Sequence, residues 1–141
     1  MKSRDSLIRL KRFQVDEKRR QVTQIETMII EFERMARELN DQILAEQERA
    51  GIHDIAHFAY PTFARAAAQR RDNLVASAGE LREQLAAAQD DLAIAVEELK
   101  KFELLAERDH ERERAANVRA EQQQIDEVAG RRARGSGYMP Y

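Results

Sequence analysis

Two long stretches of this sequence repeat apolar residues every three and four positions, which is the heptad pattern of a coiled coil. Residues 6–50 and 80–129 also contain neither glycine nor proline. A seven-residue apolar repeat gives a helix one narrow stripe, which is buried against a partner helix in a left-handed supercoil. The pattern therefore predicts an all-α protein with helices over residues 6–50 and 62–129, a connector at 51–61 and a flexible tail at 130–141.

The apolar rows identify the residues expected in the core. In the first helix one row contains Ile8, Val15, Val22, Ile29, Ala36, Ile43 and Ala50, and a second contains Ile25, Phe32 and Leu39. In the second helix the rows contain Leu74, Leu81, Ala88, Ala95 and Phe102, and Ala78, Leu85, Leu92, Leu99 and Ala106. Lys11 interrupts the first helix's rows and is expected to face Phe102.

The rows of the two helices also match each other. In an antiparallel hairpin the numbers of facing residues have a constant total, and Val22 with Leu92 gives 114 while Phe32 with Leu81 gives 113. Half of either total lies inside the connector, which the glycine and proline pattern located independently. This agreement favours one antiparallel coiled-coil hairpin whose second helix is longer. Totals shifted by seven also match, and a domain-swapped dimer has the same contacts, so both alternatives stay open.

The composition narrows the functional classes. Ala, Glu, Lys, Leu and Arg supply about half of the 141 residues, as is typical of coiled coils. The longest apolar runs are about five residues, so we expect no membrane span. The start of the chain leads into no apolar region, so we expect no secretory signal. There is no cysteine, and the formal net charge of -2 gives no general attraction to nucleic acid.

Patterns that indicate catalysis or metal binding are weak. His53 and His57 are spaced like the histidines of a zinc-binding HExxH motif, but Asp54 replaces the glutamate and no third ligand is evident. The sequence has no glycine-rich phosphate loop and no nucleophile elbow, and a two-helix hairpin has no cleft that excludes water. We therefore expect no enzyme activity, no cofactor and no metal site.

Three surface features remain for partner binding. Residues 1–20 carry a net charge of +5 and lie beside residues 97–113, whose net charge is -3. This indicates either charge pairing within the hairpin or a basic tip for a protein partner. Nucleic acid is a third alternative, but no aromatic stacking platform accompanies the arginines. Residues 107–129 extend beyond the first helix, so they should project with little packing. The connector concentrates apolar side chains that form either a cap over the core or an exposed patch: Ile52, Ile55, Phe58, Tyr60 and Phe63.

Short motifs in this order resemble one family. The opening residues 7–13 followed by 15–19, the Tyr60-Pro61-Thr62-Phe63 segment and the Ile125-Asp126-Glu127-Val128-Ala129 segment are similar to those of the flagellar export protein FliJ family. The resemblance covers residues 1–134 as a single domain. It implies a fold like the central stalk of rotary ATPases and a non-enzymatic role in the flagellar type III export apparatus, which serves motility.

The resemblance also implies partners and contact residues. It implies that residues 1–20 and 107–129 enter a hexameric flagellar export ATPase ring, with contacts at Arg9, Arg12, Lys18, Arg19, Ile125, Asp126 and Glu127. It implies that the export gate membrane protein contacts the start of the second helix at Tyr60, Phe63, Ala67 and Arg70. Export chaperones are the third implied class of partner. We expect a cytoplasmic monomer, peripheral at the inner face of the cell membrane. A generic coiled-coil scaffold and an injectisome stalk protein remain as alternatives.

Overall fold

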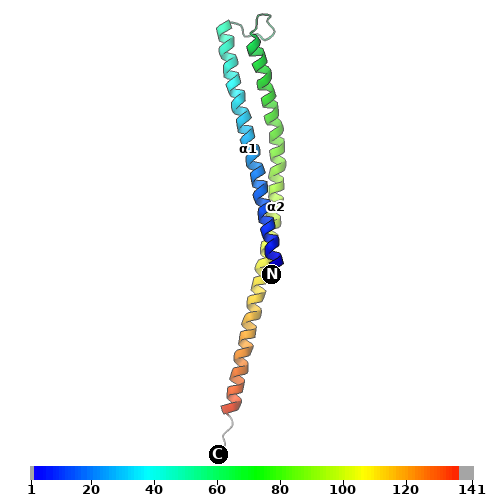
Figure 1. Ribbon diagram of the computed structural model, residues 1–141, viewed down its shortest axis with the longest axis vertical. Coiled ribbons are helices and arrows are strands. Elements are labelled where there is room, and N and C mark those ends of the chain that lie inside the picture. The colour runs from blue at the N-terminus through cyan, green and yellow to red at the C-terminus, as the bar shows by residue number, and fades with distance from the viewer. Residues whose placement is uncertain (1, 137–141) are drawn as a thin grey trace, which may run out of the picture.

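The computed structural model describes residues 2–136, which form two α-helices and one connector (Figure 1). Helix α1 spans Lys2–Ala50 and helix α2 spans Thr62–Ser136. The helices run antiparallel and side by side from the connector to the N-terminus, where α2 continues alone (Figure 1). The prediction of an all-α hairpin with a longer second helix is confirmed.

Both helix ends at the connector have local causes. Gly51 adopts a φ of 72°, and the N–H of Ile52 donates to the carbonyl of Gln47 at 3.2 Å. This is a Schellman motif, and it favours glycine because a Cβ atom is strained in the left-handed region. Helix α2 follows Pro61, whose carbonyl accepts the N–H of Arg65 at 3.1 Å. The fixed φ of proline suits the first turn of a helix, so the chain re-enters helix there.

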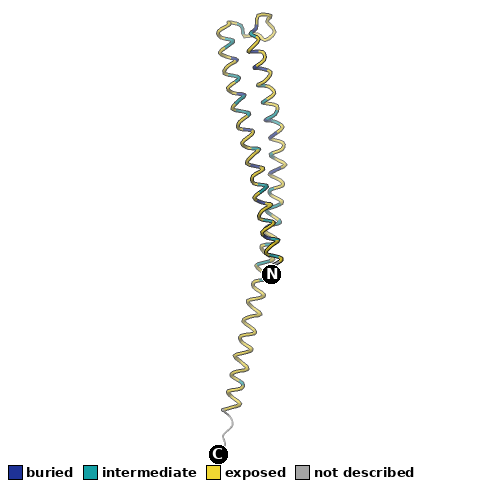
Figure 2. Tube along the Cα trace, viewed as in Figure 1, coloured by how far each residue is buried: buried dark blue, intermediate teal, exposed yellow. Residues whose placement is uncertain are grey.

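The core is a single stripe between the two helices (Figure 2). The buried members of the predicted rows are Ile8, Val15, Val22, Ile29, Ala36, Ile43, Ala78, Leu81 and Ala88. The larger residues of the second row and of α2 are half-buried: Ile25, Phe32, Leu39, Leu74, Leu85, Leu92, Leu99 and Phe102. Two helices cover each other on one side only, so bulky side chains remain partly open to solvent. The last residue of the first predicted row, Ala50, is exposed because α1 ends there.

Contacts across the hairpin agree with the predicted register. The Nζ of Lys11 lies 5.6 Å from the ring centroid of Phe102, a pair whose numbers total 113. Arg4 forms an ion pair with Asp109, which gives the same total nearer the start of α1. Arg4 and Lys11 are one heptad apart on α1, so the register is consistent along this part of the hairpin.

The connector both caps the core and exposes apolar side chains. Tyr60 is 4% exposed, and its hydroxyl accepts a hydrogen bond from Nε2 of Gln47 at 2.8 Å. Ile52 packs beside it against a small buried cluster made of Ile43, Tyr60, Ala64, Ala67 and Ala68. The other large apolar residues of this segment face solvent: Ile55, Phe58 and Phe63. Each of the two expected interpretations therefore holds for part of the segment.

The helices are longer than the sequence predicted. Helix α1 begins at Lys2 rather than at residue 6, and α2 continues through Gly130 and Gly135 to Ser136 rather than ending at residue 129. Glycine costs a helix about 1 kcal/mol, which is too little to end one whose neighbours are alanine and arginine. Of the predicted tail, residues 130–136 are thus helical, and residues 137–141 lie outside the described part of the chain.

Arg4 near the start of α1 pairs with Asp109, and beyond this end of the hairpin α2 continues with no partner helix from the described part of the chain (Figure 2). We call residues 110–136 the overhang. Every side chain described in it is exposed, and only Gly130 is half-buried. At 1.5 Å per residue, the overhang is about 40 Å long. Within residues 2–136, neither helix is apolar enough over a sufficient length to cross a membrane.

Candidate functional site

The basic end of α1 is held to α2 by charge. Three ion pairs join the helices there: Arg4 with Asp109, Lys11 with Glu98 at 3.0 Å, and Arg12 with Glu103 at 3.6 Å. The side chain of Lys11 is 19% exposed, whereas that of Arg12 is 62% exposed and its pair contributes little to stability. Charge pairing within the hairpin, one of the interpretations of this end, is therefore present.

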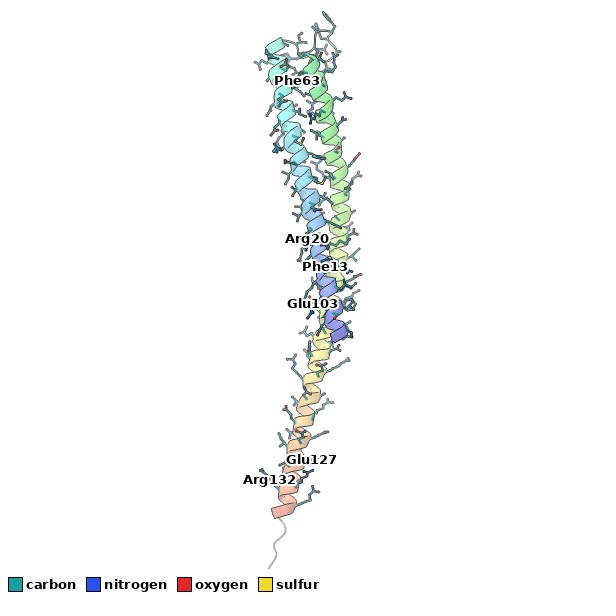
Figure 3. All side chains as sticks on the ribbon, in the orientation of Figure 1. Phe13, Arg20, Phe63, Glu103, Glu127 and Arg132 are labelled. Atoms are coloured by element: carbon teal, nitrogen blue, oxygen red, sulfur yellow. The ribbon has the colours of Figure 1, made fainter. Side chains whose placement is uncertain are left out.

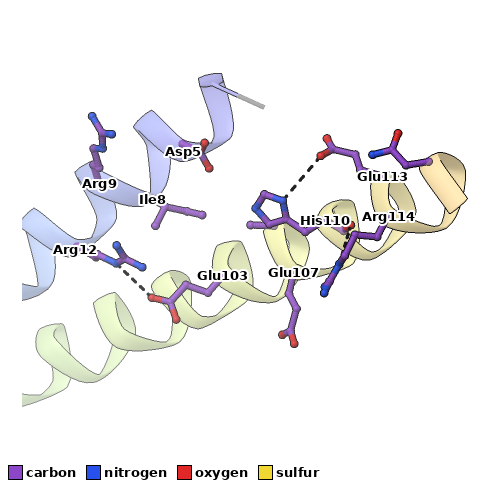
Figure 4. Close-up of a pocket in the computed structure, with 11 residues that line it drawn as sticks. Asp5, Ile8, Arg9, Arg12, Glu103, Glu107, His110, Glu113 and Arg114 are labelled. Carbon is purple, nitrogen blue, oxygen red and sulfur yellow. Dashed lines mark hydrogen bonds and ion pairs between the residues drawn. The ribbon is translucent and has the colours of Figure 1, made fainter.

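Of the four cations predicted to contact the ATPase, two form ion pairs within residues 2–136 and two do not. Arg12 is engaged across the hairpin, and Arg19 lies 3.8 Å from Asp16 within α1. Arg9 and Lys18 form no ion pair with any residue in the described part of the chain. Arg9 also extends away from α2 (Figure 4). Arg9 and Lys18 are therefore the cations whose charge remains uncompensated for a partner.

The start of α1 leaves an open notch against α2 (Figure 4). Its volume is about 800 Å³, and both signs of charge line it, including Arg9 and Arg114 beside Glu107 and Glu113. His110 lies at its centre, with Nδ1 3.9 Å from a carboxylate oxygen of Glu113. Small-molecule sites are enclosed and mostly apolar. An open, charged notch of this kind is better suited to side chains of a protein partner.

The overhang carries an apolar strip on one face. Val118, Ile125 and Val128 are 63%, 61% and 46% exposed and follow one another at helical spacing. Ile125 and Val128 line a shallow groove together with Glu121, Gln124, Ala129 and Arg132. Apolar side chains at this spacing form the contact face of a helix that meets a partner. The overhang thus has one face suited to a protein contact.

The three predicted contacts near the end of α2 lie on different faces of the helix. Ile125 belongs to the apolar strip. Asp126 accepts a hydrogen bond from Nε2 of Gln122 at 3.1 Å, and Glu127 lies 4.0 Å from Arg131. Successive helical residues are separated by a rotation of about 100°, so one flat surface cannot contact all three. A partner that surrounds the helix can.

At the opposite end of the hairpin, where Phe63 lies (Figure 3), the four predicted gate residues differ in exposure. Phe63 is 55% exposed and lines a groove of about 210 Å³ with Leu39, Gln42, Ala66, Ala67 and Arg70. Ala67 is only 5% exposed, so it forms the floor of this groove. Tyr60 is buried under the connector, so its side chain supports the hairpin end instead of offering the expected surface contact. Of the four predicted gate residues, Phe63 and Arg70 are the exposed ones.

The two histidines of the connector lie outside both helices, so they do not share the helix face that an HExxH zinc site uses. Nδ1 of His57 accepts the N–H of Ala59 at 3.0 Å, and the ring stacks on Phe58. No group of three or more potential metal ligands occurs within residues 2–136. The His57 ring therefore takes part in the structure of the connector.

Val128 was named from the sequence only within the Ile125–Ala129 motif, and neither Val118 nor Phe58 was singled out as an exposed residue. Val118 and Val128 complete the apolar strip around Ile125, and their spacing was visible in the sequence. Phe58 was counted only as one of several connector residues, yet it is 93% exposed. No periodicity operates in a connector, so the sequence could not distinguish Phe58 from buried Tyr60.

Comparisons with known proteins gave one match. The family model described as flagellar FliJ protein matches residues 1–137 of the 141-residue chain. Neither the curated proteins nor the solved structures provided a match.

Proposed function

Because this chain belongs to the flagellar FliJ family and is thus a component of the flagellar protein export apparatus, we propose that it acts as a non-enzymatic stalk. In this proposal the end with both termini is surrounded by the hexameric export ATPase ring. The connector end meets the export gate at the membrane, and export chaperones bind along the way. The protein works in the cytoplasm and is peripheral at the inner face of the cell membrane through these partners.

The overhang is the observation that carries this proposal. It is about 40 Å of exposed single helix that continues α2 beyond the hairpin (Figure 1). An isolated polar helix gains nothing from tertiary packing, so a partner is the natural source of its stability. Its candidate contacts Ile125, Asp126 and Glu127 face several directions. A pore that surrounds the helix is the partner geometry that uses all of them.

A stalk of this design has a mechanical consequence. The chain has no internal symmetry, so a ring that holds it presents a different surface to each of its subunits. The hairpin joins the overhang to the connector end through a continuous core, which resists bending. We therefore propose that nucleotide-driven changes in the ring reach the gate through rotation or tilting of this rod.

The test is ATP hydrolysis by the cognate flagellar export ATPase, titrated with the full chain. We expect stimulation that saturates when each ring holds a single chain. A chain that ends at His110 keeps the core and the Arg4–Asp109 ion pair, so it should remain a folded hairpin and lose the stimulation. Circular dichroism of the shortened chain verifies the fold.

A matched pair of substitutions narrows the test to one face. Ile125→Asp places a charge in the apolar strip, whereas Gln123→Asp places the same side chain on another exposed face of the same helix. We expect the first to weaken stimulation more than the second, because only the first removes an apolar side chain from the strip. If the full chain has no effect on the ATPase at any ratio, or if the shortened chain stimulates fully, the ring assignment is wrong and a coiled-coil scaffold is the better description.

A further inference from the structure

The most exposed large apolar residue of the described chain is Phe58, at the tip of the connector. It is 93% exposed, and Ile55 nearby is 53% exposed. The connector lies at the end of the rod opposite to the overhang (Figure 1). An aromatic ring exposed to water adds no hydrophobic stabilisation to the fold, because its transfer free energy is gained only on burial. Phe58 is therefore placed for a contact outside the hairpin.

The connector holds Phe58 in position through its own hydrogen bonds. Asp54 begins a turn: its carboxylate accepts the N–H of Ala56 at 3.0 Å, and its carbonyl accepts the N–H of His57 at 3.0 Å. The carbonyl of His57 then accepts the N–H of Tyr60 at 3.0 Å. The His57 ring stacks on Phe58 with 4.7 Å between centroids. The loop on both sides of Phe58 is thus ordered in the free protein.

The base of the connector is fixed to both helices. The Tyr60 hydroxyl accepts a hydrogen bond from Gln47 of α1, and the Arg65 guanidinium of α2 lies 5.9 Å from the Tyr60 ring centroid. Nη2 of Arg65 also donates to the carbonyl of Ile55 at 3.2 Å. Ordering a loop at the moment of binding weakens an interaction, and a preorganised loop avoids that cost. These contacts hold the loop in one conformation while the ring of Phe58 stays exposed.

We propose that Phe58 is an anchor residue that inserts into an apolar socket of the export gate protein, next to the groove that contains Phe63. The inference rests on the proposed contact between the connector end and the gate. Ile55 then covers the rim of the socket, and exposed Arg70 is matched by a carboxylate of the partner. Interfaces commonly gain most of their affinity from a central aromatic anchor in a fitted pocket.

The balance of charge and area favours a protein socket over a lipid bilayer. Between residues 46 and 72 the four arginines, Arg70 among them, are offset by four carboxylates, so an anionic membrane gains no net electrostatic attraction. One phenyl ring and part of an isoleucine change a partition equilibrium by only roughly a hundred- to a thousandfold. The dissociation constant of the tip from a lipid bilayer would then be no tighter than roughly millimolar. A shaped socket adds close packing around the ring, which a fluid bilayer cannot.

The absence of tryptophan from the sequence permits a direct test. Phe58→Trp places a single fluorophore at the tip, and Phe13→Trp places one at an exposed phenylalanine far along α1 (Figure 3). Each full-length variant is mixed with the purified gate protein in lipid nanodiscs and with empty nanodiscs of the same lipid. We expect the emission of the Phe58→Trp variant to shift to the blue only when the gate is present. The Phe13→Trp variant should not respond in either sample.

Alanine variants measure the size of the contact. Phe58→Ala should weaken gate binding by roughly 10- to 100-fold, while Phe13→Ala leaves it unchanged. A blue shift of the Phe58→Trp variant with empty nanodiscs assigns the tip to lipid and overturns the inference. If Phe63→Ala weakens gate binding and Phe58→Ala does not, the anchor is wrong and the gate contact stands. If the intact chain does not bind the gate at all, the proposed gate function fails as well.

Discussion

Residues 2–109 and the overhang are both largely helical and highly charged, yet only the first region pairs two helices. In the hairpin the heptad positions mix large side chains of valine, isoleucine, leucine and phenylalanine with alanine. At the equivalent positions of the overhang stand residues such as Glu113, Ala116, Ala120 and Gln123. The first set must be buried and the second need not be. The difference shows that heptad spacing alone does not make a core, because the side chains must also be large and apolar.

The same difference separates two functions along one helix. Hairpin residues commit their apolar surface to each other, which makes that region a rod. The overhang keeps its apolar strip of Val118, Ile125 and Val128 for a partner. Because most helical stability comes from tertiary packing, we expect the overhang to open far more readily than the hairpin. The substitutions below compare the two regions in order of decreasing effect.

The largest effect is expected from a charge placed at a buried valine. Val15 is 2% exposed in the hairpin, so Val15→Asp should lower the free energy of unfolding by about 3 kcal/mol or more, since a carboxylate would be buried without a partner. Urea unfolding followed by circular dichroism measures this change. A loss of that size should abolish the cooperative transition of so thin a core.

The matched change in the overhang is Val118→Asp. Val118 is 63% exposed, so we expect the free energy of unfolding of the hairpin to stay within about 0.5 kcal/mol of the parent. Helix propensity changes equally in both variants, because the same residues are exchanged. Equal destabilisation by the two substitutions would show that the overhang is folded as part of the hairpin, which would remove the distinction between the two regions.

A smaller effect is expected from glycine replacement. A Cβ atom added at Gly79 in the hairpin or at Gly130 in the overhang would meet no heavy atom within 4 Å apart from its own neighbouring residues and the adjacent backbone of its own helix. Gly79→Ala should therefore raise the free energy of unfolding of the hairpin by about 0.5–1 kcal/mol through helix propensity. Thermal unfolding is the measurement.

Gly130→Ala should act locally. We expect slower amide hydrogen exchange around residue 130 and an unchanged unfolding temperature, because no tertiary contact links that turn to the core. A rise in the unfolding temperature as large as that for Gly79→Ala would contradict the independence of the two regions.

The smallest effect concerns surface charge on α1. A hydrogen bond from Arg34 lowers the pKa of Glu31. The folded pKa lies below the ordinary value, so the pair stabilises the hairpin above that ordinary pKa, and the contribution is lost as the pH falls through the folded pKa. Glu31 is fully exposed, so Glu31→Gln should reduce the acid sensitivity of thermal unfolding only slightly. Glu83→Gln removes an exposed carboxylate of α2 and serves as the control.

If the two glutamine variants show the same pH dependence of the unfolding temperature, the Glu31–Arg34 pair contributes nothing measurable to the hairpin. A large change at Glu31 would instead mean that surface charge rivals core burial in this rod. Either result ranks the electrostatic contribution against that of Val15.

Much of the architecture was determined by the sequence. Heptad periodicity is a local property, so it identified buried Val15 and Ile29 and the contact of Lys11 with Phe102. The glycine and proline pattern located the connector. The motifs at Tyr60–Phe63 and around Ile125 indicated the family that the comparison then supported.

Other features depended on the tertiary structure because no local pattern encodes them. The connector has no period, so only the packed hairpin shows that Tyr60 turns inward while Phe58 turns outward. Ion pairing depends on which of many charged side chains face one another, and this left Arg9 without a carboxylate partner in the described chain while Arg12 has one. Helix α2 passes Gly130 because one glycine costs less than the surrounding helix formers provide. The repeat thus specified where apolar surface is buried, and three-dimensional packing decided which side chains remain available for partners.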